Sequence, residues 1–418
     1  MNSRVQSAIL VLFALFLAIS LLSSEGTSDT QLHWLKWMSN LDQYGLVRGY
    51  EANQADYPPL SSIILFALVR ISQPLGISMF VALKLCLLLL LVVSSLLFWL
   101  WTRSFILAIA LQLALTLSCM GLTLVDIFFA PSLILALWAL QARKLTQSAF
   151  WFSVAFLTKW QPLIIAPFVV VYWASVEIRH DSGKTGFKKL GLTVLLPASL
   201  TVAACLAVFG GSMILSLQRA FSHAFLSGNA LNLGWVLTYF LRVLDPAGTG
   251  GLVDGVAAYL VTDDWRYHAL LKGLFFAAYL LTFLSFLRRE KTLQNLLLYS
   301  LVGYLSYYIL SSGVHENHMF PVVILSAALV AVNRAYLLTF LSWAFAANLN
   351  LFLFWGVGGN DPPPSRVVGV DIALPLSFLY IFLFLGLFLS TIFSKLAGAS
   401  PVVTTAGCDV RRSCSPGK

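Results

Sequence analysis

The chain has 418 residues, of which 59% are hydrophobic and only 10% are charged, and its mean hydropathy is +0.86. Soluble domains carry about a quarter charged residues, so this composition excludes a soluble globular protein and indicates an integral membrane protein. The net charge is +9, but most lysines and arginines fall in the loops of one side, as membrane topology requires, so we expect no nucleic-acid partner.

Apolar segments close to or above the roughly 20 residues that cross a bilayer recur along the chain. They lie at about 6–24, 76–101, 104–122, 126–142, 190–210, 269–287, 294–312, 319–333, 335–356 and 369–394. The first is either a cleaved signal peptide or an uncleaved anchor, and we favour the anchor because no A-x-A-like cleavage site follows it. The basic loops place both termini in the cytoplasm, which predicts one membrane domain over 1–394 and a cytoplasmic tail over 395–418.

Residues 147–176 have the length of a single span, but basic residues flank them on both sides. The charges agree with the topology only if this segment enters from the cytoplasm, turns near TKWQPL (158–163) and returns as two short half-spans. Pro162 permits such a break, because proline lacks the N–H that a helix needs. The sequence therefore predicts an all-α, polytopic protein with about 12 membrane segments, two of them short.

The first polar segment, GTSDTQLHWLKW (26–37), follows the first span on the outer side. If it continues as a helix, Asp29 and His33 share a face at i and i+4, while Trp34 and Trp37 point toward the lipid headgroups. The alternative is that Asp29 only caps this helix.

A second outer motif, ADYPPL (55–60), leads into the next membrane helix. The residue before a proline is extended and proline suits the first helical turn, so the helix should begin at the two prolines. Asp56 is then either its N-cap or, with Tyr57, part of a rigid bracket that holds the 26–57 segment over the membrane.

Asp126, at the outer mouth of a span, and Lys159, at the predicted membrane turn, are the two ionisable residues that are hardest to explain as incidental. Charges inside a membrane are costly and usually face a cavity or each other. Both readings remain open from the sequence, as they do for Asn229, Asn232 and Trp235, which either line a sugar site or pack within a polar loop.

The third outer cluster is SSGVHENHMFPVV (311–323), with His315, Glu316 and His318. These residues suit a zinc pair, ordinary interfacial histidines or an anion site, and we favour the anion site. HExxH is absent, no third ligand has a matching spacing, and the chain has no Asp-x-Asp pair, so we expect neither a metal nor a cofactor.

Together, SDTQLHW, DYPPL and VHENH resemble the motifs of the GT-C glycosyltransferases, and most of all the dolichyl-phosphate-glucose-dependent glucosyltransferases that extend lipid-linked oligosaccharides. TLVDIFFAPSLILALWAL, FLTKWQPLIIAPF and LSGNALNLGW resemble the bacterial polyprenyl-phosphate-dependent branch. The likeness covers most of residues 1–335. Asn317 departs from it, since the eukaryotic pattern has lysine there, and the chain is shorter than those relatives.

The resemblance implies a GT-C architecture in which an outer-face loop carries the catalytic Asp29 as the base. It implies transfer of a hexose, glucose or mannose, from a polyprenyl-phosphate sugar to a lipid-linked or cell-envelope glycan acceptor, with inversion. His315, His318 and Lys159 would bind the donor phosphate. The other substrate-binding candidates are His33, Asp56, Tyr57, Asp126, Asn229, Trp235 and Glu316.

We expect the protein in a bacterial inner membrane, or in the endoplasmic reticulum membrane of a eukaryote. The alternatives from another class are a secondary transporter, which would use Asp126 and Lys159 as coupling groups, and a sugar-lipid flippase. A transporter predicts two repeat halves with broken helices in matching positions. The sequence has one such broken segment and no matching half.

Overall fold

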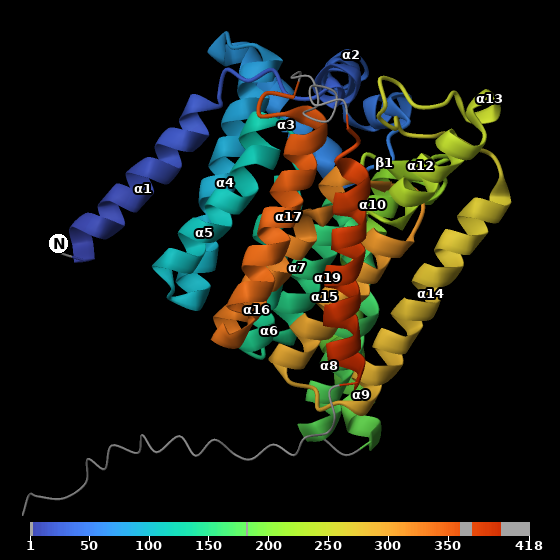
Figure 1. Cartoon of the computed structure of the whole chain (residues 1–418). Coiled ribbons are helices and arrows are strands. Elements are labelled where there is room, and N and C mark those ends of the chain that lie inside the picture. The colour runs from blue at the N-terminus through green and yellow to red at the C-terminus, as the bar shows by residue number, and fades with distance from the viewer. Residues whose placement is uncertain (1–2, 181–182, 360–369, 394–418) are drawn as a thin grey trace, which may run out of the picture.

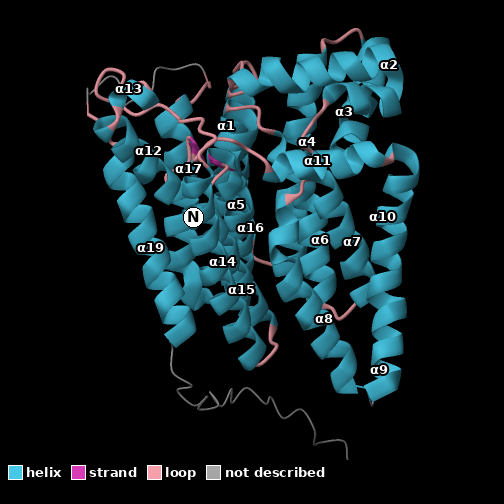
Figure 2. Ribbon diagram, turned by 90° about the vertical axis from the view of Figure 1, so that its right-hand side faces the viewer, coloured by secondary structure: helices cyan, strands magenta, loops and turns pink. Residues whose placement is uncertain are grey.

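The structure is a computed structural model that describes residues 3–180, 183–359 and 370–393. It is an upright bundle of helices, with shorter helices lying across one end (Figures 1 and 2). The prediction of an all-α chain is confirmed, apart from one pair of two-residue strands. The predicted tail over 395–418 lies outside the described residues.

The first half of the chain is built almost entirely from helices and helical turns. These are α1 (Ser3–Ser20), η1 (Thr30–Leu35), α2 (Lys36–Asn53), α3 (Pro59–Leu75), α4 (Met79–Thr102), α5 (Phe105–Thr116), η2 (Leu117–Gly121), η3 (Val125–Phe129), α6 (Ala130–Gln141), α7 (Leu145–Thr158), η4 (Gln161–Ile165), α8 (Ala166–His180), α9 (Gly183–Leu190), η5 (Gly191–Leu195) and α10 (Leu196–Phe209).

The second half adds the two short strands and further helices. These are α11 (Gly211–Phe221), β1 (Ser227–Gly228), α12 (Leu233–Leu244), α13 (Pro246–Thr249), α14 (Trp265–Arg288), α15 (Leu293–Leu310), β2 (Val314–His315), η6 (Glu316–Met319), α16 (Phe320–Val332), η7 (Arg334–Tyr336), α17 (Leu337–Trp355) and α19 (Ala373–Phe393).

Within the described residues, five helical segments are long and apolar enough to cross a membrane by length and composition. They are Met79–Thr102, Lys188–Phe209, Trp265–Arg288, Arg334–Trp355 and Ala373–Phe393. Each coincides with an apolar segment expected from the sequence. Several shorter apolar helices match other expected spans but are only 10–17 residues long. Five full-length candidates are fewer than the about 12 segments expected, and they indicate a membrane protein.

The predicted break near residues 158–163 is present. α7 ends at Thr158, Lys159 is extended with φ −150° and ψ 137°, and η4 follows from Gln161. Pro162 occupies the first turn of η4, where its missing N–H costs no helical hydrogen bond. The chain therefore interrupts its helix next to Lys159 and continues into α8.

α15 is the central helix of the bundle, and its buried residues occur on every face of the helix. It packs against α14, α16 and α19. Its buried tyrosines reach hydrogen-bond partners: the hydroxyl of Tyr304 donates to the carbonyl of His318 at 2.9 Å, and the hydroxyl of Tyr308 donates to Asn350 Oδ1 at 2.6 Å. Buried polar groups need such partners, and these bonds fix the outer end of α15 against η6 and α17.

The polar segments that were predicted to lie outside the cytoplasm meet at one end of the bundle. α2 and α11 lie across the ends of the upright helices (Figure 2). β1 pairs in parallel with β2, with Ser227 opposite Val314 and Gly228 opposite His315. This short pairing joins the segment after α11 to the segment after α15, and so brings together residues that are far apart in sequence.

Candidate functional site

A cavity of about 670 Å³ opens where these polar segments meet. Its lining residues come from five separate parts of the chain, at 29–37, 53–57, 159–164, 219–225 and 307–318. Three of these parts contain the predicted outer motifs and a fourth contains the helix break. A cavity lined by apolar and aromatic side chains together with a few convergent polar groups is the usual setting of a binding or catalytic site.

Asp29 and His33 share a face, as predicted. His33 Nε2 lies 3.8 Å from Asp29 Oδ1, and the side chain of Asp29 keeps 36% of its exposure. Asp29 immediately precedes η1, but its side chain makes no capping hydrogen bond, so the reading of Asp29 as a mere helix cap is wrong. Burial raises the pKa of the Asp29 carboxyl above its ordinary value, although the charge of His33 acts to lower it. A carboxylate with a raised pKa is better suited to accept a proton.

Trp34 and Trp37 do not face the lipid headgroups, so that expectation is wrong. Both are buried, and their rings pack edge-on against Tyr57 with centroid distances of 5.4 and 5.6 Å. The non-helical segment before Pro58 brings Tyr57 back over η1. Packed against each other, the three aromatic rings bury more apolar area than they would at the membrane–water interface. This aromatic cluster fixes the Asp29 segment to the Asp56 segment.

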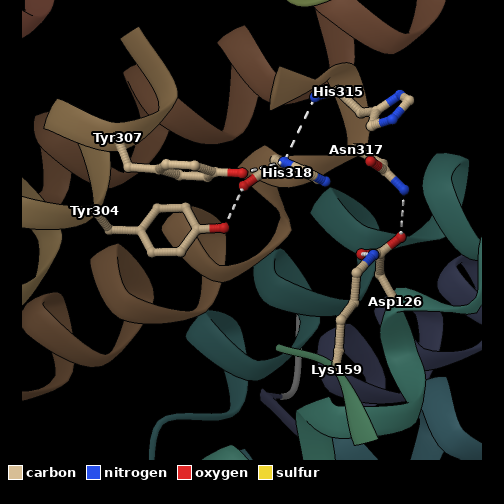
Figure 3. Close-up of polar contacts among 7 residues, drawn as sticks. All are labelled: Asp126, Lys159, Tyr304, Tyr307, His315, Asn317 and His318. Atoms are coloured by element: carbon tan, nitrogen blue, oxygen red, sulfur yellow. Dashed lines mark hydrogen bonds and ion pairs between the residues drawn. The ribbon is translucent and has the colours of Figure 1, made fainter. Parts of the chain in front are cut away.

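Asp126 and Lys159 form a buried ion pair (Figure 3). Asp126 is fully buried and also accepts a hydrogen bond from Asn317 Nδ2 at 3.1 Å. Lys159 Nζ lies 4.9 Å from the ring centroid of Tyr57, and Lys159 lines the cavity. The mutual-pairing alternative is therefore confirmed. Asn317, the position that departs from the eukaryotic pattern, supplies an amide donor to the same carboxylate.

His315 and His318 both line the cavity, with ring centroids 5.4 Å apart. The backbone N–H of His315 donates to His318 Nδ1 at 3.5 Å, and the Tyr307 hydroxyl lies 2.8 Å from the same atom (Figure 3). Burial lowers the pKa of His315 to about 3, so its imidazole is neutral at physiological pH. Both rings are available as hydrogen-bonding groups, and His318 is already engaged at one nitrogen.

Asp56 is not the cap of the following helix, because α3 begins after Pro58 and has no side-chain cap. Its Oδ2 instead lies 3.5 Å from His223 Nε2. His223 and Arg219 line the cavity, and the sequence analysis missed both. The available signal was a histidine just after the amphipathic stretch 211–221, in a segment predicted to lie outside the cytoplasm.

Four predicted substrate-binding residues do not line the cavity: Asp126, described above, and Glu316, Trp235 and Asn229. Glu316 is buried and accepts a hydrogen bond from Trp355 Nε1 at 3.0 Å. Trp235 is fully buried against Phe354, and the carbonyl of Asn229 accepts a bond from Asn350. The nearby Asn232 caps α12 through the N–H of Trp235. The packing alternative is correct for Trp235 and Asn232, whose side chains are fully buried.

Comparison with known proteins found no matching family model and no matching curated protein. A functional assignment therefore depends on the resemblance of the short motifs and on the geometry of the cavity. That geometry unites a half-buried carboxylate, a second carboxylate paired with a histidine, and a lysine at a helix break.

Proposed function

We propose that this chain is a membrane glycosyltransferase of the GT-C type that moves a hexose, glucose or mannose, from a polyprenyl-phosphate sugar to a lipid-linked or cell-envelope glycan. The observation that carries the proposal is the meeting of Asp29, Asp56, Lys159, His315 and His318 in one cavity. These residues come from the three motifs that resemble the family and from the helix break. We further propose about 12 membrane segments, with this cavity on the non-cytoplasmic face.

The chemistry is a single displacement. Asp29 accepts the proton of the acceptor hydroxyl while that oxygen bonds to the anomeric carbon of the sugar. The bond from the anomeric carbon to the phosphate oxygen breaks, and its electron pair leaves with the lipid phosphate. Attack opposite to the leaving group inverts the anomeric configuration. His33 lies beside Asp29 and holds the carboxylate on the cavity side.

The leaving phosphate needs positive or hydrogen-bond-donating groups near its oxygens. Lys159, His315 and His318 line the same cavity and are the family-matched candidates. Lys159 is already paired with Asp126, so the carboxylate partly offsets the positive charge that Lys159 offers to the phosphate. The Asp126–Lys159 pair also holds the break between α7 and η4 in position beneath the substrate.

Incubation of the purified protein with a panel of polyprenyl-phosphate sugars tests the proposal. We expect mass spectrometry to show consumption of one hexose donor and release of the polyprenyl phosphate. A membrane lipid extract supplies the acceptor. Transport of a sugar-lipid across a vesicle membrane without consumption would favour a flippase or transporter instead.

Chelators should not inhibit the reaction. Within the described part of the chain, no group of three or more His, Cys, Asp or Glu side chains is arranged to hold a metal ion. A monophosphate leaving group can be stabilised by protein cations and hydrogen-bond donors alone. We therefore expect equal turnover before and after EDTA treatment. Loss of turnover with EDTA, and its return on adding zinc or magnesium, would contradict this prediction.

A further inference from the structure

His223 lies between α11 and β1, and three neighbouring side chains hold its ring. Its Nε2 is 3.5 Å from Asp56 Oδ2. The ring stacks on Phe225 with a centroid distance of 5.0 Å and meets His315 edge-on at 5.3 Å. The side chain still keeps 22% of its exposure, and the residue lines the cavity. His223 is therefore both oriented and accessible.

The backbone around His223 leaves room for this arrangement. Gly313 has φ +72°, and a Cβ added there would lie 3.2 Å from the Cβ of His223. A Cβ on Gly228 would lie 2.7 Å from His315 Nδ1. Glycine allows the paired β1 and β2 segments to approach both imidazoles. The two glycines therefore allow the backbone to pass close to the imidazole rings of His223 and His315.

Several other basic groups of the cavity are already engaged, while the exposed Lys36 lies at its edge. Lys159 is paired with Asp126, and His318 Nδ1 lies against the Tyr307 hydroxyl. Arg219, in the last turn of α11, donates to the carbonyl of Ala55 at 3.4 Å, a long bond that a stronger acceptor would replace. His223 and Arg219 therefore give this side of the cavity N–H groups that can donate to an anion.

An anion can bind on this side of the cavity only if the negative charge of Asp56 is paired, and His223 is its partner. Burial acts to raise the pKa of Asp56, but its interaction with His223 outweighs this effect, and the pKa lies below its ordinary value. Asp56 is therefore ionised at neutral pH. Without His223 this carboxylate would present an unpaired negative charge to any anion that enters the cavity.

We propose that His223 contacts the phosphate of the lipid-phosphate donor, with Arg219 beside it and with Asp56 as its positioning residue. This inference rests on the proposed function. In the bound state Nε2–H donates to Asp56, and Nδ1–H of the same imidazolium donates to a phosphate oxygen. The carboxylate thereby fixes the ring orientation, as outer partners do for histidines that bind other charged groups.

Binding of a polyprenyl monophosphate and of the matching neutral polyprenol, both in detergent micelles, tests the proposal. His223→Ala should weaken polyprenyl phosphate binding about tenfold to a hundredfold, because a hydrogen bond to a charged group is lost. Polyprenol binding should not change. His315→Ala removes a neutral imidazole and should weaken phosphate binding only about two- to tenfold.

His268→Gln is the matched control. His268 bonds to Ser312 and Thr262 outside the cavity, so polyprenyl phosphate affinity should stay within about twofold of the parent. A loss as large as that of His223→Ala would show a general effect of removing histidines from this end of the bundle. That result would overturn the assignment.

Two further variants, Asp56→Asn and Asp56→Asn/His223→Ala, distinguish direct contact of His223 with the phosphate from simple neutralisation of the Asp56 charge. If His223 touches the phosphate, the double variant should bind better than His223→Ala, because the unpaired carboxylate is gone, but should stay clearly weaker than the parent. If His223 only neutralises Asp56, the double variant should recover the parent affinity, and the proposal is then wrong. Asp56→Asn alone should weaken phosphate binding severalfold, with polyprenol binding unchanged, because the ring loses its orienting partner.

The outcomes also distinguish this inference from the proposed function. A parent protein that does not bind polyprenyl phosphate at all overturns both. A parent that binds it equally well with and without His223 overturns the inference and leaves the glycosyltransferase proposal intact. A His223-dependent phosphate site in a protein that transfers no sugar supports the inference and removes the proposed reaction.

Discussion

Replacing Asp29 by asparagine should lower turnover by about 10²- to 10⁴-fold, the usual contribution of a general base, which corresponds to roughly 3 to 5 kcal/mol of barrier. Asparagine keeps the shape of the side chain but cannot accept the acceptor proton. The side chain of Asp29 makes no capping bond, so the substitution removes no helix cap. Donor binding should persist, because the base acts on the acceptor.

His33→Ala, measured in parallel, is the comparison for the Asp29 result. His33 is 3.8 Å from the carboxylate and is the more exposed of the two, so its removal should cost less turnover than removal of the base. Turnover of Asp29→Asn within a few-fold of the parent would make Asp29 structural. The role of the base would then pass to Asp56, which lines the same cavity.

The pH profile gives a second readout for Asp29. The base acts in its ionised form, and burial raises the pKa of Asp29 above its ordinary value of 3.8. Turnover should therefore fall as the pH decreases through that raised pKa, at a higher pH than an ordinary aspartate would require. The residual turnover of Asp29→Asn should lack this acid limb. An unchanged acid limb in the variant would assign the titration to another group.

Breaking the buried Asp126–Lys159 pair should be the most destabilising change in the site. Lys159→Met leaves Asp126 as an uncompensated charge with 0% exposure, and such losses cost about 3 to 5 kcal/mol. The hydrogen bond from Asn317 remains but cannot replace a charge. Thermal unfolding of the detergent-purified protein measures the effect as a clear decrease in Tm.

The double variant Asp126→Asn/Lys159→Met is the control for that result. With both charges removed, the uncompensated carboxylate disappears, so the Tm should recover part of the loss. A Tm of Lys159→Met equal to that of the parent would contradict the importance of the pair. A double variant no more stable than Lys159→Met would show that the packing of the lysine chain, not the charge, matters.

Local patterns in the sequence predicted the helices and the break at Lys159. Apolar runs and the proline at 162 are local signals, and they located the five long helices and the end of α7 correctly. The shared face of Asp29 and His33 followed from helical spacing. These features depend on the near neighbours of each residue, which the sequence displays directly.

The errors concern contacts between distant segments. Trp34 and Trp37 pack on Tyr57, and Trp235 packs on Phe354, through chain reversals that no local pattern encodes. His223 was missed for the same reason, because its partner Asp56 lies in another part of the chain. Residue type and spacing favoured a site at Asn229 and Trp235, whereas the β1–β2 pairing and α17 enclose that segment.

The anomeric configuration of the product tests the central claim most directly. Parent protein is incubated with an excess of the polyprenyl-phosphate hexose that it consumes, with a lipid extract as the source of acceptor, and nuclear magnetic resonance identifies the new linkage. A single displacement assisted by Asp29 predicts a product whose configuration is opposite to that of the donor. Retention of configuration, or donor that remains intact with every hexose offered, would contradict the account.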